Sequence, residues 1–224
     1  MKTVLLSFNL LLIAFISLNC DKDDGPIYSY GWNCGNKVFY AEKFYNTVQI
    51  GNKCWLKENL DVGRMVLGTD TAKNNRIIEK YCYKNDTANC SIYGGLYTLN
   101  EAMQYTTIPG VRGICPPWWH IPTYEEFQEL ITTADSDGNA LKAIGQGWGV
   151  NTGTNTSGFS ALLAGYRSHY GNFTGMEYGF FWGSTEGGYP LGSIAMLLYP
   201  SSSYVDLTYY HLVENGFSVR CIKD

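Results

Sequence analysis

Two pairs of residues in this chain combine side chains that could do chemistry together. Cys115 and His120 lie close in the sequence and could form a nucleophile and its base. Asp206 and His211 could form an acid/base pair. Each pair also has a simpler interpretation, a structural disulfide at Cys115 and an unconnected surface pair at Asp206 and His211. The chain lacks the GxSxG, HExxH, P-loop and EF-hand motifs, so the sequence predicts a non-catalytic protein.

A longer stretch, from Trp148 to Glu186, mixes aromatic rings, amides and a few charges among many glycines. Rings can stack on the apolar faces of a ligand while amides and hydroxyls pair with its polar edges, a chemistry that suits carbohydrate or protein recognition. Each member could equally be structural, and Phe181 and Trp182 could pack in the core. The candidate ligand-binding residues are Asn151, Asn155, Tyr166, Arg167, His169, Tyr178, Trp182 and Glu186.

We expect no metal ion and no cofactor. Asp135 and Asp137 lie in an Asp-Ser-Asp-Gly segment, but two carboxylates fall short of the roughly 6 to 8 oxygen ligands that Ca²⁺ prefers. Asp137 is therefore predicted to cap a helix. The chain has no CxxC pair and only three histidines, which argues against a thiolate zinc site.

Local signals predict the elements that must position these residues. Gly51-Asn52 separates two alternating runs, 47–50 and 53–56, and is typical of a two-residue hairpin turn. Thr98 and Thr123 are each followed three residues later by glutamate, the pattern of a capping box, so a helix is expected to begin at each. A third short helix is predicted over 140–144.

The rest of the chain is predicted to form loops and short strands. Residues 61–92 are polar and irregular, and four apolar runs read as strands: 159–163, 179–182, 193–198 and 217–222. A hairpin, then helices, then strands favours the α+β class. Charged residues make up 16% of the chain and the net charge is −4, so no basic surface for nucleic acid is expected.

The first twenty residues resemble a bacterial lipoprotein signal. Lys2 precedes an apolar run, 4–18, that is too short to span a bilayer, and Cys20 follows Leu18-Asn19 as in a lipobox. The resemblance implies a lipid on Cys20, with ordinary signal cleavage nearby as the alternative. The acidic cluster 21–24 resembles the surface-export signal of Bacteroidetes lipoproteins, or is a solvated part of a flexible tether over 21–33. We expect an outer-membrane protein at the cell surface, in contact with the membrane only through Cys20.

Ordered motifs across the remaining domain, 34–224, resemble the Fibrobacter succinogenes major paralogous domain. They include Cys115-Pro-Pro-Trp-Trp-His-Ile-Pro-Thr123 and Phe217-Ser-Val-Arg-Cys221, together with 48–60, 93–97, 158–161, 164–167 and 181–186. That family is similar to the C-type lectin-like fold that formylglycine-generating enzymes share. The resemblance implies short twisted antiparallel sheets, two or three helices and long loops, with 148–186 as the ligand-binding loops. It implies architecture more than activity, and the calcium-binding tripeptides of C-type lectins are absent.

Six cysteines follow Cys20 and allow 15 pairings. The resemblance implies a bond between Cys115 and Cys221, the long-range bridge of C-type lectins. Cys82 and Cys90 bracket one short polar loop and are expected to pair locally, which leaves Cys34 for Cys54.

The sequence thus predicts a surface lipoprotein with one disulfide-stapled domain that binds an extracellular carbohydrate or protein. The alternative is a structural component of the envelope or of a surface complex that degrades polymers. Thr71 and Thr87 lie in Asp-Thr-Ala segments, which resemble the O-glycosylation acceptors of Bacteroidetes.

Overall fold

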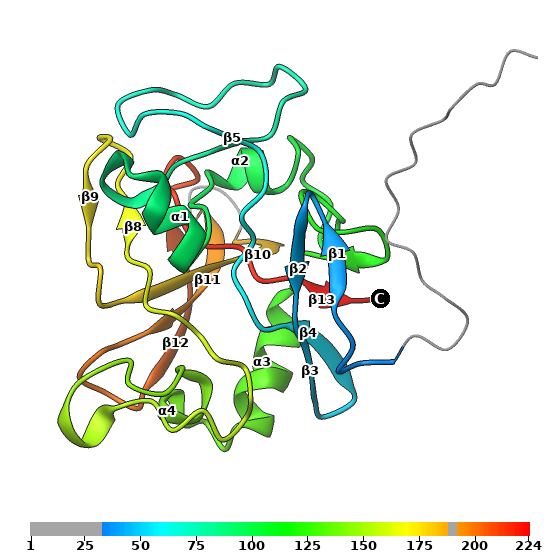
Figure 1. Ribbon diagram of the computed structural model, residues 1–224, viewed down its shortest axis with the longest axis vertical. Helices are drawn as coiled ribbons and strands as arrows, with labels where there is room; N and C mark the ends of the chain where they lie inside the picture. The colour runs from blue at the N-terminus through cyan, green and yellow to red at the C-terminus, as the bar shows by residue number, and fades with distance from the viewer. Residues whose placement is uncertain (1–32, 188–191) are drawn as a thin grey trace, which may run out of the picture.

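The computed structural model describes residues 33–187 and 192–224, which fold into small sheets, short helices and long loops (Figure 1). The expected signal peptide, the expected lipidation site at Cys20 and all of the expected tether except residue 33 lie outside the described residues. Within them, no helix is both long and apolar enough to cross a membrane.

The N-terminal part forms two successive hairpins. Strands β1 (Val38–Tyr40) and β2 (Lys43–Tyr45) form the first, and β3 (Thr47–Ile50) and β4 (Lys53–Leu56) form the second. The second hairpin turns at Gly51, whose φ of +59° is one that glycine adopts without steric cost. It joins β13 (Ile222–Lys223) and β7 (Trp119–His120) in a four-stranded sheet of order β3-β4-β13-β7. The predicted hairpin is confirmed.

A second sheet contains the three longest strands. It is an antiparallel meander of β10 (Gly179–Glu186), β11 (Ser193–Leu198) and β12 (Val205–His211). Alternate side chains of β11 enter different core clusters: Ala195 and Leu197 contact one, while Met196 and Leu198 contact the other. Both faces of this sheet are therefore covered. Smaller two-stranded pairs are β5 (Arg64–Met65) with β6 (Glu79–Lys80), which run parallel, and β8 (Tyr166–Arg167) with β9 (Phe173–Thr174).

The helices confirm one sequence prediction fully and others in part. Thr123 and Glu126 form a complete capping box at the start of α3 (Tyr124–Thr133). At α2 (Leu99–Ala102), Thr98 caps the helix, but the Glu101 carboxylate accepts bonds from Glu79 and Tyr105 instead of closing the box. Asp137 caps the short helix α4 (Gly138–Leu141) as predicted. The remaining helices are α1 (Thr87–Tyr93), η1 (Tyr83–Asn85) and η2 (Gly149–Asn151).

Four expectations about regular structure need correction. Residues 61–92 are not wholly irregular, because they contain α1 with its Asp86 cap, η1, β5 and β6. The third helix covers Gly138–Leu141, so it begins two residues before the predicted 140–144 span and ends within it. The runs 159–163 and 217–222 are largely buried but contain little regular strand: Ala161, Phe217 and Ser218 form isolated bridges, and Ile222 alone belongs to a strand, β13. Their backbones pair with a different neighbour at almost every step, so apolarity is present without a continuous ladder.

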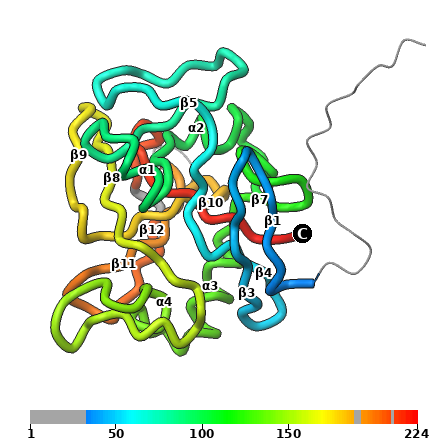
Figure 2. The backbone as a smooth tube through the Cα atoms, in the orientation of Figure 1, coloured from blue at the N-terminus to red at the C-terminus, as the bar shows by residue number. Residues whose placement is uncertain are grey.

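The C-terminal segment connects the two sheets (Figure 2). Its backbone bonds β10 at Ser218, then Leu60 through Val219 and Leu56 through Cys221, before Ile222 enters the four-stranded sheet. Residues 217–222 are almost fully buried, and Phe217 stacks against Trp182 with ring centroids 4.3 Å apart. This segment therefore packs both core clusters together, one around Trp182 and Trp119 and the other around Trp55 and Phe127.

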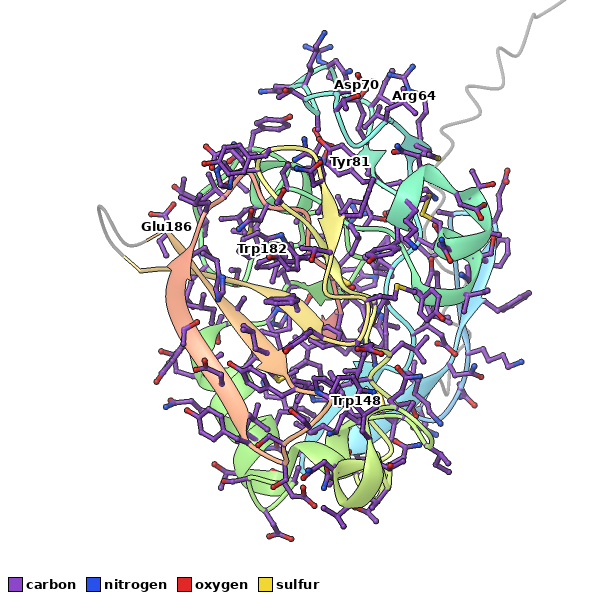
Figure 3. All side chains as sticks on the ribbon, turned by 90° about the vertical axis from the view of Figure 1, so that its left-hand side faces the viewer. Arg64, Asp70, Tyr81, Trp148, Trp182 and Glu186 are labelled. Carbon is purple, nitrogen blue, oxygen red and sulfur yellow. A yellow bond between two sulfur atoms is a disulfide. The ribbon has the colours of Figure 1, made fainter. Side chains whose placement is uncertain are left out.

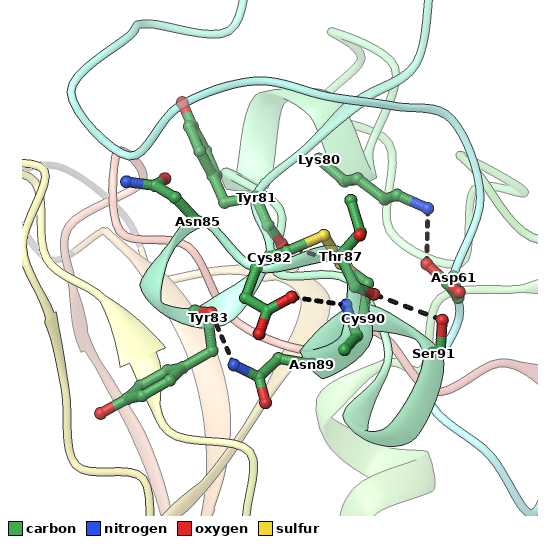
Figure 4. The surroundings of a disulfide bond; sticks show 12 residues. Asp61, Lys80, Tyr81, Cys82, Tyr83, Asn85, Thr87, Asn89, Cys90 and Ser91 are labelled. Carbon is green, nitrogen blue, oxygen red and sulfur yellow. Dashed lines mark hydrogen bonds and ion pairs between the residues drawn. A yellow bond between two sulfur atoms is a disulfide. The ribbon is translucent and has the colours of Figure 1, made fainter.

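Three disulfides staple the fold, and their pairing is the one the sequence analysis expected. They join Cys34 to Cys54, Cys82 to Cys90, and Cys115 to Cys221. The Cys82–Cys90 bond ties the residue before η1 to α1 (Figure 4), where Asn89 also donates to the carbonyl of Tyr83. The Cys115–Cys221 bond holds the C-terminal segment to the loop that follows α2. The structure is thus of mixed α and β composition, with small, mostly antiparallel sheets and three disulfide staples.

A charged network fixes the start of α3 to the end of the chain. His120 lies between two carboxylates, with Nδ1 2.5 Å from Asp224 Oδ1 and Nε2 2.9 Å from Glu126 Oε2. Burial disfavours the charged form of the His120 imidazole. The hydrogen bonds and charges of Glu126 and Asp224 outweigh this effect and raise the His120 pKa. Burial is likewise outweighed at Glu126, where bonds from His120 and Thr123 lower the pKa to about 2.

This network predicts a pH-dependent contribution to stability. Because the Glu126 pKa falls from 4.5 to about 2 on folding, its contribution is present above pH 4.5 and lost as the pH falls toward 2. Because the His120 pKa is raised above 6.5, its contribution is present below pH 6.5 and lost as the pH rises through that raised value. We therefore expect Glu126→Gln, which can still close the capping box, to lower the melting temperature most between these limits.

Thermal unfolding of the wild-type protein and of Glu126→Gln from pH 2 to 8 measures the difference between their melting temperatures. Glu125→Gln is the matched control, because Glu125 is exposed in the same helical turn. A Glu126→Gln deficit as large at pH 2 as at pH 5.5 would contradict the expectation.

Candidate functional site

The eight candidate residues between 148 and 186 do not form one surface. Figure 3 shows Trp148 and Glu186 well apart, with Trp182 near the middle of the molecule. Residues 154–161 bond the backbone of α4, whereas β10 carries Trp182 and Glu186 in the three-stranded sheet. The interval is thus continuous in sequence but divided in space.

Trp182 is a core residue. Its side chain is fully buried, its ring packs on Phe217, and its Nε1 donates to the carbonyl of Tyr97 at 2.7 Å. The ring has no exposed face for a ligand, which corrects its place among the candidates. The alternative that the sequence left open, core packing of Phe181 and Trp182, describes both residues.

Arg167 also has a structural role. It is 5% exposed, and its guanidinium donates to three backbone carbonyls: Nε to Gly68 at 2.7 Å, Nη1 to Glu214 at 3.1 Å and Nη2 to Asp70 at 3.2 Å. The guanidinium also lies over the Tyr81 ring, 4.3 Å from its centroid. Arg167 therefore joins the 68–70 loop to the 214–216 turn, and it is corrected from ligand-binding candidate to loop anchor.

The two asparagines stabilise loops. Asn151 donates from its side-chain Nδ2 to the carbonyl of Ser201 at 2.8 Å, and its backbone carbonyl accepts from Lys142 Nζ at 2.7 Å. Asn155 has a positive φ of 55° and its side chain bonds the amide and hydroxyl of Ser160. These contacts account for both amides without a ligand.

His169 and Glu186 are exposed but lie outside any cluster of candidates. The His169 ring stacks on Tyr170, with centroids 3.7 Å apart, and its backbone amide donates to Asn215. Glu186 is at the end of β10 (Figure 3). Their accessibility is compatible with recognition, which stays a prediction for both.

Tyr166 and Tyr178, the remaining candidates, belong to a continuous group of partly exposed rings. From Tyr166 the ring contacts pass to Phe180 at 4.7 Å, from Phe180 to Tyr178 at 6.3 Å, and from Tyr178 to Tyr199 at 5.9 Å. Tyr199 contacts Tyr204 at 6.3 Å, and Phe180 contacts His211 at 6.3 Å. We call this group the aromatic face: Tyr166, Tyr178, Phe180, Tyr199, Tyr204 and His211. All are half-buried except Tyr204, which is 62% exposed.

The aromatic face is built on the three-stranded sheet. Phe180 comes from β10, Tyr199 directly follows β11, and His211 ends β12, while Tyr166 comes from β8. Phe180 and Trp182 lie two positions apart on β10 and so share one face of the sheet, where both contact Phe217. The buried rings of Trp182 and Phe217 thus pack beneath the partly exposed ring of Phe180.

Polar groups lie among these rings. The Tyr199 hydroxyl donates to Asp206 Oδ2 at 3.1 Å, and burial together with this bond raises the Tyr199 pKa to about 12. His211 Nε2 lies 2.9 Å from Thr208 Oγ1, and burial of the imidazole lowers its pKa. At neutral pH the group therefore presents neutral rings and hydroxyls with one carboxylate, Asp206.

Neither pair considered for catalysis is assembled. The Cys115 sulfur is bonded to Cys221, and His120 lies between two carboxylates. Asp206 bonds Tyr199, whereas His211 bonds Thr208. In the part of the chain that the structure describes, no group of three or more His, Cys, Asp or Glu side chains is placed to hold a metal ion.

Thr71 and Thr87, the expected O-glycosylation sites, are both exposed. Thr87 is the first residue of α1, beside the Asp86 cap, and its carbonyl accepts a bond from Ser91 (Figure 4). Both hydroxyls can thus be reached by an enzyme, and their modification stays a prediction.

Sequence reasoning missed four members of the aromatic face: Phe180, Tyr199, Tyr204 and His211. Tyr199 and Tyr204 lie beyond the interval that was searched, and His211 was considered only as an acid or base. The alternation of β10 offered one usable signal, because two-residue periodicity assigns Phe180 and Phe181 to opposite faces of the strand.

Comparison with known proteins gives one match. The model of the Fibrobacter succinogenes major domain family matches residues 48–223, which is most of the chain. No curated protein and no solved structure matches the sequence. The matched range contains every residue of the aromatic face.

Proposed function

This chain belongs to the Fibrobacter succinogenes major domain family, and we propose that it is a surface lipoprotein that binds an extracellular carbohydrate or protein. The observation that carries the proposal is the aromatic face, a chain of partly exposed rings in which Tyr199 bonds the Asp206 carboxylate and His211 bonds the Thr208 hydroxyl. Rings of this kind supply apolar contact area at a small entropic cost, and polar groups between them fix a ligand's orientation.

The finer description of the fold is part of the proposal. A C-type lectin-like arrangement is supported by the long-range Cys115–Cys221 bond, by the capped helices α2 and α3 and by long loops around small antiparallel sheets. In this arrangement the loops beside the three-stranded sheet form the recognition surface.

The location at the outer membrane, on the cell surface, is supported by the lipobox-like sequence at Cys20 and the acidic residues after it. The three disulfides fit an oxidising compartment outside the cytoplasm. The mass of the N-terminal peptide of the mature protein tests the lipid on Cys20, because an unmodified peptide beginning elsewhere excludes it.

Substitutions in the aromatic face test the binding proposal. We expect Tyr178→Ala and Tyr166→Ala to weaken binding by about 30-fold, the equivalent of about 2 kcal/mol, because each removes a ring at a partly desolvated contact. The ligand is first found by a glycan array and by affinity capture from culture medium, and calorimetry then measures its affinity for each variant.

Tyr170→Ala is the matched control, since Tyr170 is a 79% exposed tyrosine that contacts His169 outside the aromatic face. Melting temperatures identify variants that are merely unstable. Undiminished affinity in both stable variants would exclude the aromatic face as the binding site.

A second candidate function is assembly into the envelope or into a surface complex that degrades polymers. It is favoured by three apolar side chains on one loop, Ile144, Trp148 and Val150, which are 79%, 52% and 94% exposed. Trp148→Ala distinguishes the two functions. The variant should bind the ligand normally if the aromatic face is the binding site. It should lose association with the envelope or the surface complex if the loop with Trp148 is the assembly site.

A further inference from the structure

The charges in the sequence segments that carry the aromatic face restrict what it can bind. From Ser168 to Val219 the sequence contains no lysine or arginine, and from Ala143 to Tyr166 it contains no charged residue of either sign. Five of the six residues of the aromatic face lie in the first of these segments, and Tyr166 ends the second. The formal charges in the first segment are all acidic: Glu177, Glu186, Asp206 and Glu214.

The cations that border these segments are already engaged. Arg167 donates to the carbonyls of Gly68, Asp70 and Glu214, as described above. Lys142 is fully buried, and its Nζ donates to the carbonyls of Asn151, Tyr199 and Ser202 at 2.7, 2.9 and 3.1 Å. Arg220 is also fully buried, and it donates to Asn59, Leu56 and Phe159. A ligand anion would have to break these bonds to reach any of the three charges.

The groups that remain at the aromatic face suit a neutral ligand rich in hydroxyls. Asp206 is partly exposed and accepts one bond from Tyr199, so its carboxylate retains capacity to accept from ligand hydroxyls. It would repel a carboxylate, sulfate or phosphate held nearby. Tyr199 and His211 are both neutral at pH 7 because burial shifts the pKa of Tyr199 upward and that of His211 downward. Neither offers a counter-charge.

Building on the proposed function, we propose that the aromatic face binds a neutral glycan, a sugar polymer without carboxylate, sulfate or phosphate groups. The rings would stack on the C–H faces of the sugars, while Asp206, Thr208 and the tyrosine hydroxyls would bond sugar hydroxyls. A protein ligand is the less favoured occupant, because the polar groups between the rings are hydroxyls and one carboxylate, which match the closely spaced hydroxyls of a sugar ring.

Polysaccharides that share a backbone and differ in charge test this proposal. Native gels containing hydroxyethyl cellulose or carboxymethyl cellulose form one pair of probes, and highly methyl-esterified pectin or polygalacturonate forms another. The mature protein should be retarded by the neutral member of at least one pair, with affinity at least tenfold higher than for its anionic counterpart. Tyr178→Ala should lose this retardation.

Asp206→Asn tests the role of the carboxylate. It should narrow the preference for the neutral member, whereas Glu214→Gln, an equal charge change at an exposed residue outside the aromatic face, should leave the preference intact. Equal or tighter binding of the anionic members overturns the proposal. Retention of a protein that depends on Tyr178, with no polysaccharide bound, also overturns it but leaves the proposed function standing. If neither a polysaccharide nor a protein binds in a way that depends on Tyr178, both the neutral-glycan proposal and the proposed function are overturned.

Discussion

Replacing Cys115 and Cys221 together by alanine is expected to lower the free energy of unfolding by about 5 kcal/mol, because their bond closes a long loop of the unfolded chain. The two residues are 106 positions apart in the sequence. Most domains have a total stability of about 5–15 kcal/mol, so a loss of this size would leave much of the variant unfolded. The bond also fixes the C-terminal segment that packs the two core clusters together.

The Cys82–Cys90 pair provides a matched control. Its cysteines are also buried, but the two residues are only 8 positions apart, so the same chain-entropy argument gives about 2.5 kcal/mol for Cys82→Ala with Cys90→Ala. Urea unfolding of the two double variants under non-reducing conditions measures the difference. A larger loss from the short loop than from the long one would show that loop length does not govern these bonds.

Local sequence signals were sufficient wherever a few neighbouring residues decide the conformation. The hairpin at Gly51 and the capping box of Thr123 and Glu126 both depend on side chains within four residues of the feature they determine. Such signals determine the local structure when no tertiary contact takes up the side chains involved. The Cys115–Cys221 pairing is a long-range feature, and the family resemblance supplied it.

Buried cations could not be predicted because residue type alone indicates a surface position. Arg167, Lys142 and Arg220 are each 5% exposed or less. Each lies where two or three backbone carbonyls converge from segments distant in the sequence, and this convergence exists only after folding. For the same reason the interval 148–186 predicted a single recognition surface, whereas the fold divides the interval. The aromatic face combines three residues of the interval, Tyr166, Tyr178 and Phe180, with three residues beyond it, Tyr199, Tyr204 and His211.

Replacing Arg220 by methionine is expected to lower the free energy of unfolding by about 3–5 kcal/mol, because several buried acceptors lose their donor at once. Arg220 is fully buried in the C-terminal segment and donates to Asn59 Oδ1 at 2.7 Å and to the Phe159 carbonyl at 2.6 Å. Its guanidinium lies 4.5 Å from the centroid of the Phe159 ring. Burial lowers the Arg220 pKa to about 9, so the side chain still carries its charge at neutral pH.

Two further variants separate charge from geometry. Arg220→Lys keeps the charge, but a lysine ammonium lacks the planar fork that donates to Asn59 and Phe159 at once. We therefore expect it to recover only part of the stability that Arg220→Met loses. Arg112→Met is the control, since Arg112 is exposed and donates from Nε to the Cys115 carbonyl, and it should cost less than about 1 kcal/mol. Urea unfolding gives these values, and near-ultraviolet circular dichroism checks that each variant retains native packing. If Arg220→Met costs no more than Arg112→Met, the carbonyls around Arg220 must find other donors, and the closing arginine of the Phe-Ser-Val-Arg-Cys motif would not be needed for stability.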